Sequence, residues 1–165
     1  MSASTEPTLL RPATAADVPL ILHFIRLLAR YEKLEHHVVA TEDSIREYLF
    51  GPRAYAEVVF AELGGKPVGF ALFFPTFSTF VGRPGIYLED VFVEPQWRSR
   101  GVGRQLLAHV ASIGAARGCQ SMNWAVLPWN APAIRFYRRL GAEKVTEWDG
   151  FRIDGEAFSR LARLR

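Results

Sequence analysis

One stretch of the sequence, from Ile86 to Gln105, limits the possible folds more than any other. Its first part, Ile86 to Val93, is rich in β-branched and aromatic residues, which predicts a mostly buried strand that ends at Glu94-Pro95. Arginines and glycines fill the turn that follows, and a helix is expected to begin near Val102. Free backbone N–H groups and the positive end of the helix dipole face outward at such a turn, so this stretch predicts a binding site for a phosphate group.

Periodic patterns predict the elements around this stretch. Apolar runs predict strands at Thr8–Arg11, Ala56–Leu63, Pro67–Phe74, Gln120–Leu127, Lys144–Trp148 and Phe151–Ile153. Helical spacing and capping residues predict helices from about Asp17 to Tyr31, from Thr41 to Gly51, from Val102 to Gly118, from Asn130 to Gly141 and from Glu156 to Arg165. The strand, helix and strand that begin at Ile86 imply a right-handed crossover and local parallel pairing.

Pro75 to Pro84 predicts a loop. Its apolar side chains Phe77, Phe80 and Val81 leave two interpretations open. They line a binding cleft, or the loop folds back on the core.

Length and composition favour one globular domain over residues 1–165. The chain is 49% hydrophobic and 22% charged, which is ordinary for a soluble globular enzyme. A single cysteine, Cys119, excludes an internal disulfide framework, and the four histidines lack the spacing of metal ligands, so we expect no metal. The net charge of +3 comes from arginines scattered along the sequence, which argues against a nucleic-acid partner and for a small anionic ligand.

The sequence also predicts a cytoplasmic protein without a membrane partner. It has no apolar run of about 18 residues, the length that a membrane span needs. Met1 to Pro7 lacks the charged and apolar regions of a signal peptide.

The order of these elements resembles the GNAT superfamily of acyl-CoA-dependent N-acetyltransferases over nearly the whole chain. The most specific match is Arg98-x-x-Gly101-x-Gly103, which is similar to the superfamily's pyrophosphate motif and stands between a buried strand and a helix. The resemblance implies an α/β (α+β) fold. Its sheet is expected to be mixed and mostly antiparallel, with six to seven strands, a central parallel pair that splays apart at the acyl-CoA site, and helices on both faces.

Within the superfamily the sequence looks like the spermidine/spermine and thialysine acetyltransferase branch. The matching segments are Arg11–Asp17, Tyr31-Glu32, Phe50-Gly51, Tyr87–Asp90 and Trp129-Asn130. Two departures stand out. Ser99 replaces a glycine of the family motif, which costs little if its φ is negative. Ser78 and Phe80 stand where polyamine enzymes carry acidic and tryptophan residues, and this favours a small diamine or thialysine over a long polycation.

The resemblance implies direct transfer of an acetyl group from acetyl-CoA to a primary amine. Tyr137 matches the family's general acid, since a phenol can protonate the departing thiolate, although a tyrosine on an amphipathic helix is also typical of a core. Successive strand residues face opposite sides, so one of Glu89 and Asp90 is expected to face the cleft. We assign Glu89 as the base and Asp90 as a substrate carboxylate, with a structural pair to an arginine as the alternative for Asp90.

The predicted binding residues fall into two sets. The cofactor set is Val91, Phe92, Val93, Arg98, Ser99, Arg100, Gly101, Val102, Gly103, Arg104, Asn130 and Tyr137. The amine set is Tyr31, Glu32, Glu89 and Asp90, where Glu32 is either part of the pocket or a solvated helix end.

Other functions remain open at this stage. A non-catalytic acyl-CoA-binding or sensing module would bind CoA without forming an acetylated product. A nucleic-acid-binding protein would bind DNA in a salt-dependent way without CoA affinity. The amine could also belong to a protein or an antibiotic, and the resemblance further implies a homodimer.

Overall fold

The computed structural model describes residues 7–164. Met1 to Glu6, where no signal peptide is expected, lie outside the described residues, and so does Arg165, the predicted end of the last helix. The chain divides into two compact units, one that extends to Ala125 and one that begins at Val126. Each unit is described by itself. No helix among the described residues is both long enough and apolar enough to cross a bilayer.

The first unit is built on a five-stranded sheet in the order β1-β2-β3-β4-β5. Its strands are β1 (Leu9–Pro12), β2 (Glu57–Leu63), β3 (Lys66–Ser78), β4 (Arg83–Val93) and β5 (Met122–Asn123). Neighbouring strands from β1 to β4 are antiparallel, whereas β4 and β5 are parallel. The parallel pair that the crossover argument predicts is therefore present, but it lies at the edge of the sheet.

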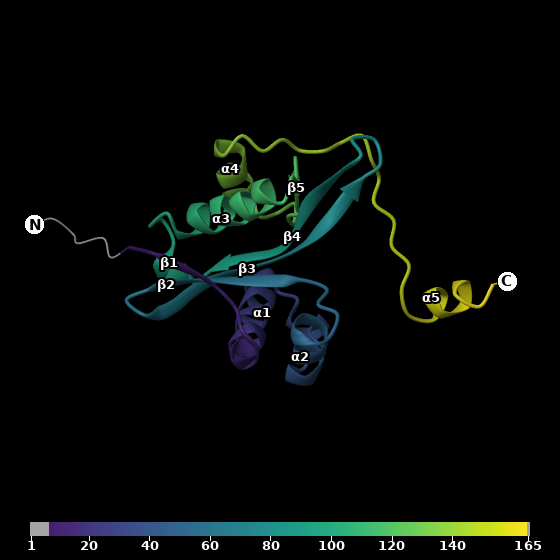
Figure 1. Cartoon of the computed structure of the whole chain (residues 1–165), viewed down its shortest axis with the longest axis horizontal. Coiled ribbons are helices and arrows are strands. Elements are labelled where there is room, and N and C mark those ends of the chain that lie inside the picture. The colour runs from purple at the N-terminus through teal and green to yellow at the C-terminus, as the bar shows by residue number, and fades with distance from the viewer. Residues whose placement is uncertain (1–6, 165) are drawn as a thin grey trace, which may run out of the picture. The chain divides into compact units, whose positions relative to one another are not determined.

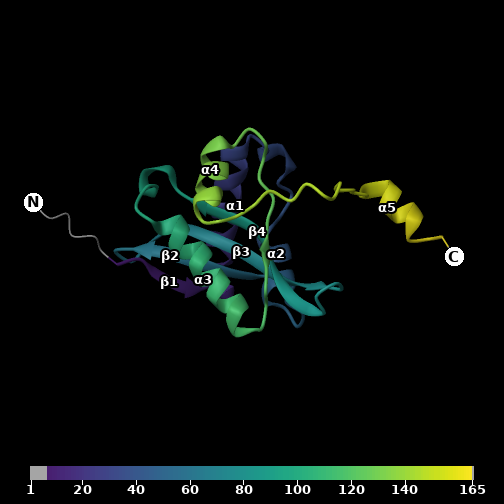
Figure 2. The same ribbon diagram turned by 90° about the horizontal axis from the view of Figure 1, so that it is seen from above.

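Helices cover both faces of this sheet, as predicted (Figures 1 and 2). Helices α1 (Val18–Glu32) and α2 (Glu42–Phe50) lie on one face, and α3 (Val102–Ala116) lies on the other. Side chains of α1 and α2 share one buried cluster with Phe60, Phe70 and Phe92 of the sheet, and the Phe24 ring of α1 stacks 5.4 Å from that of Phe70. On the other face, Arg117 after α3 donates a 2.8 Å hydrogen bond to Glu57 of β2.

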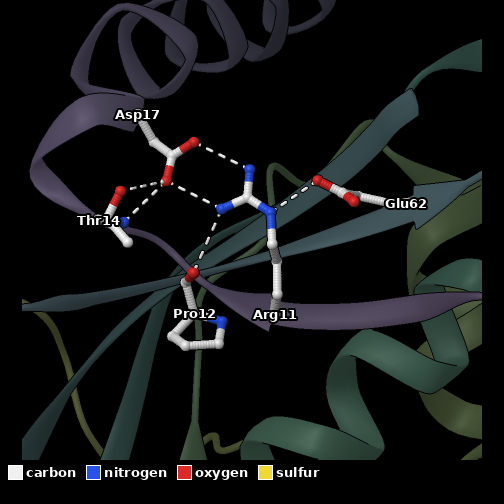
Figure 3. A network of polar contacts seen from close by, with 5 residues as sticks. All are labelled: Arg11, Pro12, Thr14, Asp17 and Glu62. Carbon is white, nitrogen blue, oxygen red and sulfur yellow. Dashed lines mark hydrogen bonds and ion pairs between the residues drawn. The ribbon is translucent and has the colours of Figure 1, made fainter. Parts of the chain in front are cut away.

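An arginine network holds the start of α1 to the sheet (Figure 3). Asp17 accepts hydrogen bonds from the backbone N–H and the hydroxyl of Thr14, which form a capping box before the helix. The Arg11 guanidinium in β1 donates two 2.9 Å bonds to Asp17 and one 2.7 Å bond to Glu62 of β2. These contacts lower the pKa of Asp17 and raise that of Arg11, so each charge stabilises the other.

The expected six to seven strands are wrong, because the two strands predicted at the C-terminal end do not form. Lys144–Trp148 and Phe151–Ile153 belong to no strand, and the side chains of Val145 and Phe151 are 61% and 98% exposed. An isolated two-stranded hairpin is marginal in water unless a further strand or helix covers its apolar side. The predicted strand Gln120–Leu127 is likewise reduced to Met122–Asn123.

The prediction of a loop at Pro75–Pro84 is also wrong for most of its length. Pairing of β3 with β4 continues to Ser78 and Arg83, because the Thr and Phe residues of this segment suit a strand, and only residues 79–82 turn. Phe77 and Phe80 are 66% and 88% exposed, so the segment does not fold back on the core. The cleft interpretation remains untested.

The second unit contains α4 (Ala131–Arg139) and α5 (Gly155–Leu161). As predicted, Asn130 caps α4, and its side-chain oxygen accepts a bond from the Ala133 N–H. Pro132 lies in the first turn and Gly141, at φ 87°, follows the end of the helix.

Candidate active site

A β-bulge in β4 decides where the two predicted carboxylates point. Leu72 of β3 pairs with Asp90 and the next residue, Phe73, pairs with Leu88, so Glu89 is an extra residue without a partner on β3. Directly paired residues share a face of the sheet. Asp90 and Phe92 therefore lie on the α1 face, whereas in a regular strand Asp90 would share the α3 face with Leu88. Bulges near active sites commonly redirect side chains in this way.

Three carboxylates gather where α1 ends beside β4. Glu89 is exposed at the bulge, whereas Asp90 is half-buried. The pKa of Asp90 is raised from its usual 3.8 to about 7, chiefly by burial and then by the negative charges of Glu89 and Glu32. Burial also raises the pKa of Glu32. Among residues 7–164 no ion pair involves Asp90 or Glu32, so the predicted alternative, a structural pair to an arginine, is absent for Asp90. Such a group favours a cationic ligand.

Tyr31 lies beside these carboxylates at the end of α1. Its ring centroid is 6.3 Å from that of Phe92, and the Arg98 guanidinium lies 4.5 Å above it. The predicted amine set thus comes together in the first unit, from α1 and from the bulged part of β4.

The turn between β4 and α3 has the geometry of an anion site. Gly101 precedes α3 with φ 83°, and no side chain caps this end of the helix. The first intrahelical bond runs from Gln105 N–H to Gly101, which leaves the N–H groups of Val102, Gly103 and Arg104 outside that ladder. A glycine is required at position 101, because other residues are strained at such a φ. Free N–H donors at a helix start suit a phosphate group.

The backbone of Ser99 does not have the negative φ at which the serine would cost little. Its φ is +62°, in the left-handed region, so the replacement of the family glycine is not without cost. A left-handed conformation costs a residue with a Cβ about 1–2 kcal/mol, and the surrounding turn must supply that energy.

Trp97 is a residue of this turn that the sequence analysis did not single out. The Arg100 guanidinium lies 4.9 Å from the Trp97 ring, so the indole holds this cation beside the start of α3. The indole N–H of Trp97 is buried and has no hydrogen-bond partner among the described residues. The sequence Trp97-Arg98-Ser99-Arg100 is the only signal that points to this stack, since it brings an indole next to two cations.

The outer edge of β4 is open after Tyr87. Pairing with β5 ends at Tyr87 and Asn123, so residues 88–93 have no partner strand on that side within residues 7–125. Free backbone groups of an extended strand pair readily with an extended ligand. Val91, Phe92 and Val93, predicted to contact the cofactor, lie on this open edge.

The second unit carries Asn130 and Tyr137. Asn130 is 8% exposed and occupies the cap of α4, and Tyr137 lies near the end of the same helix with its ring 5.4 Å from that of Phe136. Their predicted roles toward the cofactor stay predictions.

No group of three or more His, Cys, Asp or Glu side chains that could hold a metal ion occurs among residues 7–164.

Comparisons with known proteins agree with this geometry. Residues 22–142 match the model of the acetyltransferase (GNAT) family. The chain is 37% identical to mouse (Mus musculus) thialysine N-epsilon-acetyltransferase over 94% of its own length and 97% of that protein. It is 29% identical to L-ornithine N5-acetyltransferase NATA1 of Arabidopsis thaliana, with 94% of this chain and 88% of that protein covered.

Solved structures show the same fold. The integron cassette protein VCH_CASS6 from the mobile metagenome of V. cholerae superposes with a TM-score of 0.78 at 26% identity, over 95% of this chain and 98% of that one. The aminoglycoside N-acetyltransferase AAC(6')-Iy in complex with CoA gives a TM-score of 0.73 at 21% identity, over 93% and 99% of the two chains.

Proposed function

This chain belongs to the acetyltransferase (GNAT) family and is an N-acetyltransferase, and we propose that it moves an acetyl group directly from acetyl-CoA to a primary amine of a small molecule. One observation carries the proposal. The same strand, β4, carries a half-buried carboxylate with a raised pKa and is followed, after a short turn, by an uncapped helix start with a left-handed glycine. In this proposal residues 1–165 act as one domain.

The cofactor side uses backbone groups more than side chains. The N–H groups of Val102, Gly103 and Arg104 bind the pyrophosphate, with Arg100 held nearby on Trp97. The open edge of β4 at Val91 to Val93 binds the extended arm of the cofactor, and one of its N–H groups stabilises the developing oxyanion. Acetyl-CoA supplies the activated acetyl group.

The amine side must bind an ammonium and then remove its proton. Asp90, with Glu32 and Tyr31 beside it, binds the cation. Glu89 is exposed at the bulge, where water reaches its carboxylate, so we assign it as the base that accepts the proton through water. Tyr137 donates a proton to the departing thiolate.

The substrate class follows from charge and size. The relatives named for thialysine and L-ornithine act on small amino acids with a side-chain amine. We expect a substrate of this kind, with a diamine as the nearest alternative, because Ser78 and Phe80 replace acidic and tryptophan residues that would suit a long polyamine. We also expect the protein to be cytoplasmic and to form a homodimer. Sedimentation of the purified protein would test the homodimer.

Replacing Tyr137 by phenylalanine tests the reaction itself. We expect Tyr137→Phe to lower kcat for thialysine by about a hundredfold, since the thiolate then leaves without its proton donor. The Kd of acetyl-CoA from calorimetry is expected to change little. Tyr48→Phe on α2, where the side chain is 49% exposed, is the matched control and should leave kcat unchanged. Unchanged turnover in Tyr137→Phe would remove the assignment of the acid.

Glu89→Gln tests the base. We expect the pH profile of kcat/KM to change, because the proposed proton acceptor is lost. A pH profile identical to that of the unmodified protein would contradict the assignment. If the protein binds CoA and acetylates no amine, it is a binding module and the proposed reaction is wrong.

A further inference from the structure

Arg98 begins the pyrophosphate motif, yet its side chain lies on the amine side of the site. Its Nε–H donates a 2.8 Å hydrogen bond to the carbonyl oxygen of Val93 at the end of β4. The guanidinium carbon lies 4.5 Å from the ring centroid of Tyr31 and 5.4 Å from that of Phe92. The side chain thus bridges the last residues of α1 and β4.

These contacts suit arginine and no other side chain. A guanidinium is planar and weakly hydrated, so it stacks on aromatic rings while its edge still donates hydrogen bonds. A lysine at this position would keep the charge but lose the flat contact and the Nε–H donor. Tyr31 of α1 is far in the sequence from Phe92 and Val93 of β4, and the Arg98 side chain contacts both elements.

Backbone strain marks both sides of this contact. Among residues 7–164 the non-glycine residues with positive φ are Lys33 and Ser99, both at 62°. Lys33 follows Tyr31 and Glu32 at the end of α1, and Ser99 follows Arg98. Such conformations persist only where the surrounding contacts hold them, and they cluster at functional sites.

We propose that Arg98 is a positioning residue whose side chain holds the Tyr31-Glu32 end of α1 against β4, and so fixes the acidic side of the amine site. Its backbone stays in the turn that binds the cofactor. The side chain itself is not a phosphate ligand. The amine part of this inference rests on the proposed function, whereas the contact between α1 and β4 does not.

One consequence separates this role from phosphate binding. Without the Arg98 side chain, Tyr31 and Glu32, which bind the amine in the proposed function, are held less firmly. The backbone donors at the start of α3 still bind the cofactor. Arg98→Met is therefore expected to raise the KM for the amine and to leave the Kd of CoA nearly unchanged.

The test uses Arg98→Met and Arg98→Lys in the full chain. Arg98→Met keeps the stem and removes the guanidinium, and Arg98→Lys keeps only the charge. Arg11→Met is the matched control, since it frees the other end of α1. The measurements are the KM and kcat for thialysine and L-ornithine, the Kd of CoA by calorimetry, and amide hydrogen exchange at residues 31–35.

We expect Arg98→Met to raise the amine KM about tenfold, with kcat and the Kd of CoA changed less than about threefold. Exchange at residues 31–35 should become faster, and Arg98→Lys should restore less than half of each effect. Arg11→Met should lower stability and leave the amine KM unchanged.

A tenfold weaker CoA affinity in Arg98→Met, with unchanged exchange at residues 31–35, would overturn the inference and make the side chain a phosphate ligand. An unchanged amine KM with unchanged exchange would overturn it as well. If the unmodified protein acetylates neither these two amines nor a small diamine, the proposed function fails. The exchange and calorimetry then still decide the role of Arg98.

Discussion

The two ends of α1 are both tied to the sheet by an arginine, but the partners of the two arginines differ. At the start, Arg11 meets the carboxylates of Asp17 and Glu62 at 2.9 and 2.7 Å. At the end, Arg98 meets the rings of Tyr31 and Phe92 and a backbone carbonyl. The same residue type therefore pairs with charge at one end and with aromatic surface at the other.

The two ends of α1 also differ in the pKa values of their carboxylates. At the start, pairing with Arg11 lowers the pKa of Asp17. At the end, Arg98 is engaged by rings, and burial raises the pKa of both Glu32 and Asp90. One end of the helix uses its charges for stability. The other keeps half-buried carboxylates without an ion-pair partner among the described residues, which costs stability and suits the cationic amine of the proposed function.

The largest test of this contrast is Asp90→Asn. The folded pKa of Asp90 is raised, so its ionisation destabilises the fold as pH rises from 3.8 through about 7. Asp90→Asn should gain up to about 4 kcal/mol of unfolding free energy at pH 8 and nothing near pH 3. Its kcat/KM for thialysine should fall about a hundredfold, because the ammonium loses its half-buried partner. Urea unfolding at both pH values and steady-state kinetics measure the two effects. A loss of stability at pH 8 would contradict the contrast.

Arg11→Met is expected to act in the opposite sense. It should lower the unfolding free energy by about 1–3 kcal/mol at pH 7, because Asp17 and Glu62 lose a half-buried partner. The pKa of Asp17 is lower in the folded than in the unfolded protein. The stabilisation by Arg11 is therefore complete above the unfolded pKa of 3.8 and is lost as pH falls from there through the folded pKa. Urea unfolding at pH 7 and near pH 2 checks the sign. Arg30→Met is the control, since the Arg30–Glu35 pair is exposed and should contribute little.

Glu32→Gln should shift the pH dependence of kcat/KM more than it lowers the highest kcat/KM. The charge of Glu32 helps to raise the pKa of Asp90, so its removal lowers that pKa. Activity rises with pH as Asp90 ionises near pH 7, and the variant should reach its plateau at lower pH. Profiles of kcat/KM measure this shift. Glu35→Gln, on an exposed carboxylate beyond α1, is the control, and an equal shift in both variants would rule out a local effect.

Ser99→Gly should give the smallest change. Glycine relieves the positive φ beside Arg98 but loses more chain entropy on folding, so we expect a gain of about 0.5–1 kcal/mol. Ser112→Gly within α3 should lose about as much, because glycine is unfavourable inside a helix. Thermal unfolding of both variants tests the pair of signs. A loss of stability in Ser99→Gly would mean that the serine hydroxyl supports the turn.

Local signals predicted most of the helices and the cofactor turn. The capping box at Thr14 and Asp17, the Asn130 cap and the glycine before α3 each act within a few residues of the chain, so their effects can be derived from neighbouring letters. The prediction of strands at Lys144–Trp148 and Phe151–Ile153 was wrong because it, too, used neighbouring residues alone. Val145 and Phe151 have the local pattern of strands, but strands form only where another element covers them.

The sequence by itself determined most of the helices and the position of the glycine turn, because these depend on short-range backbone preferences, and its motifs indicated the family. Only the tertiary structure decided that a bulge at Glu89 turns Asp90 toward α1, and that Arg98 lies on Tyr31. Both results depend on contacts between residues distant in the sequence. The burial that raises the pKa of Asp90 exists only when the strand and the helix are packed together.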